Sequence, residues 1–205
     1  MRSSVLIRWL AVAAAVLTLQ VGHAARAADL EPAAAQVDAF DKALLDTMKD
    51  GKTLGMAGRI RKLAPAIDRA FDLAKMTRFS VGPSWTTMSA SDQKALIDAF
   101  SRMSIATWAH NFASYGGERF QTNPVVDTRG PDKVVQTQLI PSSGAPINFA
   151  YRMQQSGGTW KIVDVYFGAI SQLTTRRSDF AAPLAAGGAP ELVKHLNALT
   201  DKLMK

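Results

Sequence analysis

The sequence contains no cysteine, and this absence narrows the chemistry available to the protein. Without thiols there can be no disulfide, no thiolate nucleophile and no cysteine metal ligand. The fold must therefore be stabilised by an apolar core, and residues 28–205 are enough for one domain with a core of useful size.

Histidine is scarce, and the common catalytic motifs are missing. After residue 27 the histidines are His110 and His195. Both fall on predicted helices, without Asp or Glu at a spacing typical of a shared metal site. There is no Walker phosphate-binding loop, no Gly-x-Ser-x-Gly and no Gly-x-Gly-x-x-Gly. We expect no catalytic residues, no cofactor and no metal.

The sequence also lacks a strong excess of charge. It has 24 Lys and Arg against 17 Asp and Glu, and three of the basic residues precede residue 28. The remaining 21 basic side chains are dispersed, which makes nucleic acid a poor partner. Transient contact with anionic lipid headgroups at a membrane surface stays possible.

Long hydrophobic runs are absent apart from residues 9–21. Arg2 and Arg8 precede this run, and Ala25-Arg26-Ala27 follows it with small residues at the spacing that a signal peptidase needs. The alternative, a retained membrane helix, requires about 20 apolar residues. We therefore predict a signal peptide over residues 1–27, cleavage near Ala27, and a periplasmic protein formed by residues 28–205.

The stretch from Ser89 to Gly117 predicts one long amphipathic helix. Ser89 is a suitable N-cap, with Asp92 three residues later near the positive end of the helix dipole. Large apolar side chains then recur on one broad face, and Gly116-Gly117 is expected to end the helix. The members of this face are Leu96, Phe100, Met103, Thr107, Trp108, Phe112 and Tyr115.

The elements around this helix predict an α+β fold. Helices are expected over residues 29–48, 56–70 and 71–81, with a kink near Ala64 because Pro65 lies inside the second. Four antiparallel strands are expected at 118–127, 133–140, 147–154 and 160–170, with Pro124 bending the first or placing it at an edge. Helices then follow at 173–184 and 190–204. This order of helices, four strands and helices is typical of an α+β fold.

Asp164 is the acid of most interest. Strict alternation along residues 160–166 places it on the same face of its strand as Trp160, Ile162 and Tyr166, where both faces are apolar. A buried carboxylate must be paired, hydrogen-bonded or neutral. One interpretation is a general base; the other, which we favour, is a structural contact with an arginine.

Five motifs, in the same order along the chain, resemble the toluene-tolerance/MlaC family of periplasmic lipid carriers. They are the run from Phe71 to Trp85, the Ser-x-x-Asp-Gln start of the long helix, Tyr115-Gly-Gly-Glu118, Trp160-Lys-Ile-Val-Asp164 and Arg177-Ser-Asp-Phe180. Residues 164–180 most resemble the hopanoid-associated HpnM branch, although Phe167 stands where an acidic residue is expected.

The resemblance implies a twisted sheet enclosed by the N-terminal and C-terminal helices around an apolar pocket, and a role in lipid transport. Such a carrier would take phospholipid or hopanoid-type lipid between the inner and outer membranes, as an auxiliary component of an inner-membrane ABC transporter complex with an outer-membrane donor or acceptor. Exposing two acyl chains of about 30 methylenes to water costs on the order of 24 kcal/mol, so a large cavity is expected. The candidate lining residues are Phe79, Trp85, Phe100, Met103, Trp108, Phe112, Tyr115, Phe149, Tyr151 and Tyr166.

Two other functions remain open. One is an enzyme with a cone-shaped apolar pocket, in which Asp164 is the general base and Tyr151 or Tyr166 donates a hydrogen bond. The other is an accessory subunit whose cavity is filled by its own side chains. For any single aromatic residue, an ordinary place in the core is the simpler interpretation.

Overall fold

The structure is a computed structural model that describes residues 30–205. The predicted signal peptide lies outside the described residues. The chain forms three helices, α1 (Pro32–Lys49), α2 (Gly51–Ala70) and α3 (Leu73–Val81), a 3-10 turn η1 (Gly82–Thr87), and the long helix α4 (Ala90–Asn111). Six strands follow, and the chain ends in α5 (Gln172–Leu203).

The strands form one antiparallel sheet. They are β1 (Arg119–Thr122), β2 (Asp127–Arg129), β3 (Asp132–Ile140), β4 (Ile147–Ser156), β5 (Thr159–Phe167) and β6 (Ile170–Ser171). The order across the sheet is β1-β3-β4-β5-β6, and β2 also pairs with β3. The α+β prediction is thus confirmed. The first predicted strand is divided at Pro124 into β1 and β2, and the fourth is divided at the Gly168 turn into β5 and β6.

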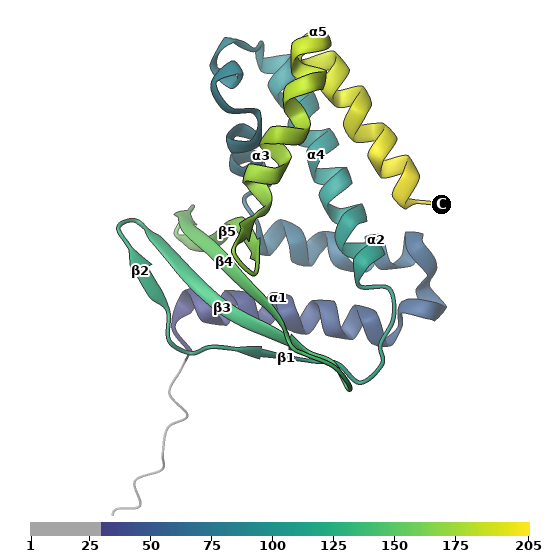
Figure 1. Cartoon of the computed structure of the whole chain (residues 1–205), viewed down its shortest axis with the longest axis vertical. Helices are drawn as coiled ribbons and strands as arrows, with labels where there is room; N and C mark the ends of the chain where they lie inside the picture. Colours follow the sequence, from purple (N-terminus) through teal and green to yellow (C-terminus); the bar gives the residue numbers. More distant parts are fainter. Residues whose placement is uncertain (1–29) are drawn as a thin grey trace, which may run out of the picture.

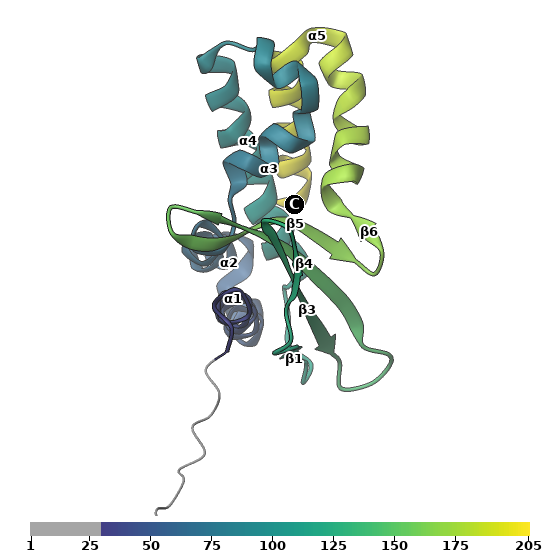
Figure 2. The same cartoon turned by 90° about the vertical axis from the view of Figure 1, so that its left-hand side faces the viewer.

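Helices α3, α4 and α5 collect at one end of the molecule, and the sheet lies at the other end with α1 beside it (Figure 1 and Figure 2). Figure 1 shows α3, α4 and α5 together above the sheet, while α1 crosses behind the strands. In Figure 2, turned by 90°, α1 lies along one side of the sheet. The buried side chains of α1 explain this packing, because Val37, Phe40, Leu44 and Met48 recur on one helical face. The opposing strand residues Val135, Phe149, Tyr151 and Met153 are also buried.

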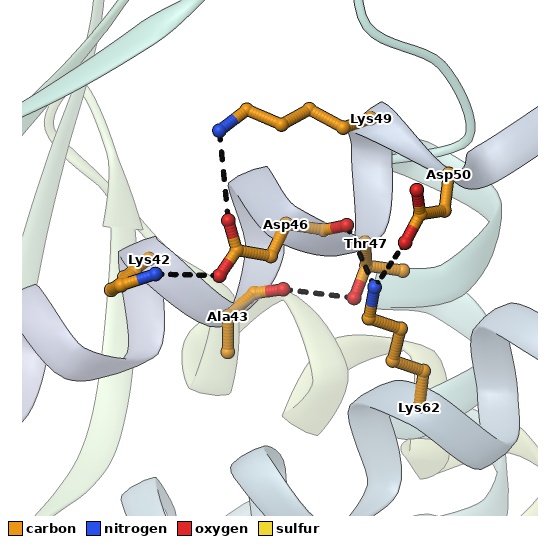
Figure 3. A network of polar contacts seen from close by, with 7 residues as sticks. All are labelled: Lys42, Ala43, Asp46, Thr47, Lys49, Asp50 and Lys62. Carbon is orange, nitrogen blue, oxygen red and sulfur yellow. Dashed lines mark hydrogen bonds and ion pairs between the residues drawn. The ribbon is translucent and has the colours of Figure 1, made fainter.

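Polar contacts fix the turn from α1 to α2. Lys62 donates from Nζ to the Asp46 carbonyl oxygen at 2.9 Å and to Asp50 Oδ2 at 2.6 Å, so one lysine joins the end of α1 to α2 (Figure 3). Asp46 also accepts a hydrogen bond from Lys42 at 2.7 Å. These groups are largely exposed, so they orient the helix pair more than they stabilise it.

The helical backbone differs from the sequence prediction at two places. α2 continues through Pro65, and its non-helical angles occur at Gly55, where φ is 59°. Glycine adopts that conformation without steric cost, so the break falls there. α4 ends at Asn111 rather than at Gly116. Just beyond this end, the Ala113 carbonyl oxygen packs on the start of α2, only 2.0 Å from where a Cβ at Gly51 would lie.

A β-bulge changes the faces of β5. Arg152 pairs with Asp164, but its neighbour Met153 pairs with Ile162, so Val163 is the extra residue. Adjacent residues on β4 point to opposite faces of the sheet. Asp164 therefore shares a face with Arg152, and Ile162 lies on the opposite face with Met153. The predicted common face for Asp164, Trp160 and Ile162 is wrong.

Candidate functional site

The long helix α4 is anchored at both ends. The Ser89 hydroxyl accepts a hydrogen bond from the Asp92 amide at 3.1 Å, as the sequence predicts. The Gln93 side chain donates to the Trp85 carbonyl at 2.9 Å and so joins η1 to the start of the helix. At the other end, Arg59 Nε donates to the Ala109 carbonyl at 2.7 Å, which satisfies a helix C-terminal acceptor. α4 is thus held against both α2 and η1.

An apolar pocket lies between α4, the start of α5 and the end of β5. Its volume is about 210 Å³. We call it the α4–α5 pocket, and its lining is Phe71, Met76, Phe100, Met103, Ser104, Thr107, Trp108, Asn111, Phe112, Val165, Phe167, Gln172, Leu173 and Arg176. The apolar side chains come from four different elements, so only the folded chain brings them together.

Aromatic rings form a continuous wall on one side of this pocket. Trp108 is central, with ring centroids 5.2 Å from Phe112, 5.8 Å from Phe71 and 5.1 Å from Phe40. Phe112 continues the wall to Phe120 at 6.2 Å. Edge-on and offset ring contacts of this kind are favourable and keep the rings in fixed orientations. The wall is therefore rigid on the α1 side of the pocket.

The polar side chains that line the pocket are partly or fully exposed, whereas most of its apolar side chains are buried, and we call the polar set the rim. Ser104, Thr107 and Asn111 contribute them from α4, and Gln172 and Arg176 contribute them from the first two turns of α5. A second hollow of about 340 Å³ adjoins this rim and shares Met103, Thr107 and Arg176 with it. We call it the α5 hollow; its other residues are His110, Leu199, Lys202 and Leu203. The arrangement is suited to an elongated molecule with an apolar body and a polar end.

The structure brings only part of the predicted lining together. Phe100, Met103, Trp108 and Phe112 all line the α4–α5 pocket. Phe149 stacks beside Phe167, 4.8 Å between centroids, and also borders a polar hollow of about 490 Å³ formed by β1, β3 and β4.

The other predicted residues lie elsewhere. Tyr151 is fully buried between α1 and the sheet, whereas Tyr115 is 44 % exposed in the loop after α4. Trp85 lies in η1. Phe79 lies 5.7 Å from the Arg152 guanidinium. Tyr166 is directly opposite Ala150 on the sheet, two residue pairs from the pair of Arg152 and Asp164.

Asp164 connects β5 to the start of α5, and among the described residues it forms no ion pair with an arginine, so the predicted arginine contact is wrong. The Asp164 side chain is 2 % exposed. It accepts hydrogen bonds from Ser171 Oγ at 2.7 Å, from the Leu173 amide at 3.1 Å and from the Val165 amide at 2.8 Å. Ser171 is the N-cap of α5. The carboxylate thus faces the positive end of a helix dipole, which stabilises its charge. Asp164 does not line the α4–α5 pocket.

Asp41 is a buried carboxyl group that the sequence analysis missed. It is 1 % exposed and accepts a hydrogen bond from Thr137 at 2.9 Å, with longer contacts of 3.5 Å to Thr122 and Tyr151. Burial raises the pKa of Asp41 to about 7. Burial also raises the pKa of Tyr151, and the nearby Asp41 carboxyl group adds to this effect. The spacing from Val37 to Asp41 to Leu44 places this acid on the apolar face of α1, a signal that was available in the sequence.

Two further features were sought among residues 30–205. None of their helices is both long and apolar enough to cross a membrane. No three of their Asp, Glu and His side chains come together in a way that could hold a metal ion.

These observations define an α+β protein with an apolar pocket where a helical end meets one edge of a sheet. Residues 38–198 match the family model for the MlaC protein, and the chain belongs to this family. The fold is also similar to that of a phospholipid-binding protein from Ralstonia solanacearum, solved in complex with a phospholipid. The TM-score is 0.72 at 24 % identity, over 85 % of this chain and 100 % of that chain. A search of curated proteins gives no match.

Proposed function

We propose that this protein is a non-enzymatic periplasmic lipid carrier. It binds a phospholipid or a hopanoid-type lipid and moves it between the inner and outer membranes as an auxiliary component of an ABC transporter. Membership of the MlaC family and the phospholipid bound to the Ralstonia protein support this proposal. The resemblance of residues 164–180 to the HpnM branch keeps hopanoids among the candidate ligands.

The α4–α5 pocket is the observation that carries the proposal. Its interior is aromatic and aliphatic, and its polar groups are at the rim. An acyl chain gains about 0.8 kcal/mol for each methylene removed from water, so such a lining stabilises tails and leaves a headgroup hydrated. Phe100, Met103, Trp108 and Phe112 would contact the acyl chains. The other predicted lining residues stay predictions.

The size of the pocket implies movement when lipid binds. Its volume of about 210 Å³ lies below the range of roughly 300–1,000 Å³ that is usual for ligand sites. Two acyl chains therefore require α4 and α5 to separate. The backbone of α5 is already non-helical at Gly187 and Gly188, where φ of Gly188 is 64°. This break divides α5 into two segments that can move separately.

Lipid content measured with a pocket-filling variant tests the proposal. Ser104 is half-buried at the pocket rim, so Ser104→Trp should project into the pocket and displace lipid with little loss of stability. The measurement is lipid retained per mole of protein by native mass spectrometry, together with the melting temperature after delipidation. Ser91→Trp, at an exposed site on α4 outside the pocket, is the control.

Two results would contradict the proposal. One is wild-type protein that carries no lipid after gentle purification and takes none from added vesicles. The other is equal lipid retention by Ser104→Trp and the wild type. A loss of about 1–3 kcal/mol in Ser104→Trp would instead indicate a closed core that is overpacked.

A further inference from the structure

The charged side chains that line the α4–α5 pocket and the adjoining α5 hollow are basic. Among the described residues that line the α4–α5 pocket, Arg176 is the only one with a charged side chain. The adjoining α5 hollow adds Lys202, and none of the described residues lining either site is Asp or Glu. Arg176 lines both sites, so this arginine lies where the α4–α5 pocket adjoins the α5 hollow.

The Arg176 guanidinium is weakly engaged by the protein itself. Its Nη1 lies 3.6 Å from Asp179 Oδ2, one turn later on α5, and the two side chains are 26 % and 46 % exposed. This ion pair is partly hydrated and longer than a normal hydrogen bond. Among the described residues, no hydrogen bond from Arg176 is found. The planar guanidinium thus keeps its paired N–H donors available.

Two other arginines show what a structural role looks like in this fold. Arg59 donates to the Ala109 and Gly51 carbonyl oxygens at 2.7 and 3.0 Å. Arg177, the next residue along α5, donates from Nε to the Phe79 carbonyl oxygen at 3.1 Å. Both therefore hold helix ends in place, whereas Arg176 has no such acceptor and faces the pocket rim instead.

We propose that Arg176, with Lys202 as a second cation, binds the anionic headgroup of the lipid. A guanidinium binds two phosphate oxygens at once, while an ammonium acts as a point charge. The neutral side chains of Asn111 and Gln172 supply further hydrogen bonds at the same rim. The site then selects phosphate-bearing lipids of net negative charge over zwitterionic lipids, and zwitterionic lipids over uncharged ones. This inference rests on the proposed lipid-carrier function.

Three lipids with identical tails test the headgroup preference. Delipidated full-length mature protein is incubated with dioleoyl phosphatidylglycerol, dioleoyl phosphatidylcholine or dioleoylglycerol, and lipid retained per mole is measured by native mass spectrometry. The wild type should retain them in that order. Arg176→Gln should weaken retention of phosphatidylglycerol by about tenfold, the scale of a hydrogen bond to a charged group, and leave dioleoylglycerol unchanged.

Matched variants separate this role from folding. Arg176→Lys keeps the charge without the paired donors and should recover part of the affinity. Lys202→Gln, at a more exposed site, should reduce retention of phosphatidylglycerol by about two- to fivefold. Arg78→Gln is the control, because Arg78 is exposed on α3 and lines neither site. Melting temperatures establish that each variant folds.

Each outcome has a distinct meaning. If Arg176→Gln retains phosphatidylglycerol like the wild type, or if the wild type retains all three lipids equally, the headgroup assignment is overturned and the carrier function stands. If the wild type retains none of the three lipids, the carrier function itself fails. If millimolar inorganic phosphate raises the melting temperature as much as phosphatidylglycerol does, the site is a phosphate site and the assignment to a lipid headgroup is overturned.

Discussion

At position 41 an aspartate lies on the face of α1 that packs against the sheet, and its pKa is raised by burial from 3.8 to about 7. Its near neighbours are the hydroxyl groups of Thr137, Thr122 and Tyr151. Hydroxyl groups compensate only part of the hydration that a carboxylate loses. The neutral acid is therefore the form that suits the folded protein.

The raised pKa of Asp41 predicts how the free energy of unfolding depends on pH. Below pH 4 the carboxyl group is neutral in both the folded and the unfolded chain. As pH rises from about 4 to about 7, the unfolded chain ionises first, so the free energy of unfolding should fall by up to about 4 kcal/mol. In Asp41→Asn this contribution disappears, and urea unfolding should show a stability advantage over the wild type that grows across this pH range.

A second aspartate on the same helix provides the control for this measurement. Asp46 is 40 % exposed and pairs with Lys42 at 2.7 Å. Asp46→Asn should therefore change the free energy of unfolding by less than about 1 kcal/mol. This variant should still show the decrease in stability between pH 4 and 7 that the wild type shows. Parallel pH profiles for Asp41→Asn and the wild type would show that Asp41 ionises normally in the folded protein.

At the scale of elements, the start of α5 depends on β5. Asp164 joins them by accepting hydrogen bonds from Ser171 and Leu173. In Asp164→Asn one carboxylate oxygen is replaced by an NH₂ group that faces other donors. The free energy of unfolding should fall by about 1–3 kcal/mol, as expected for a buried polar contact that is broken.

Thermal unfolding of Asp164→Asn checks this prediction. The control is Asp179→Asn, because Asp179 is exposed on α5 and its ion pair with Arg176 is weak. An unchanged melting temperature for Asp164→Asn, accompanied by loss of a measurable turnover, would restore the hypothesis that Asp164 is a general base.

At the scale of the whole molecule, the proposed role requires export. The motif at Ala25-Arg26-Ala27 predicts cleavage, so N-terminal sequencing of the periplasmic protein should begin near Ala28. Cytoplasmic protein from the same cells, before export, should keep Met1. Recovery of an intact Met1 from the periplasmic fraction would refute the predicted cleavage.

The sequence alone determined the elements, because the signals that specify them are local. The period of 3.6 in Val37, Phe40 and Leu44 and the alternation of Phe149, Tyr151 and Met153 identify helix and strand, and burial of these residues in the structure agrees. The Ser89 cap likewise needed only its own neighbours. Membership of the family could also be inferred, since its motifs are contiguous stretches.

Only the tertiary structure decided which of these side chains meet. Met76, Trp108 and Arg176 come from distant parts of the chain, and the pocket exists because α3, α4, α5 and β5 converge there. The bulge at Val163 moved Asp164 away from Ile162, a shift that strand alternation cannot reveal because one extra residue inverts every later position. The sequence also could not show that α4 ends at Asn111 rather than Gly116, or that the Ala113 carbonyl then packs closely against Gly51 on α2.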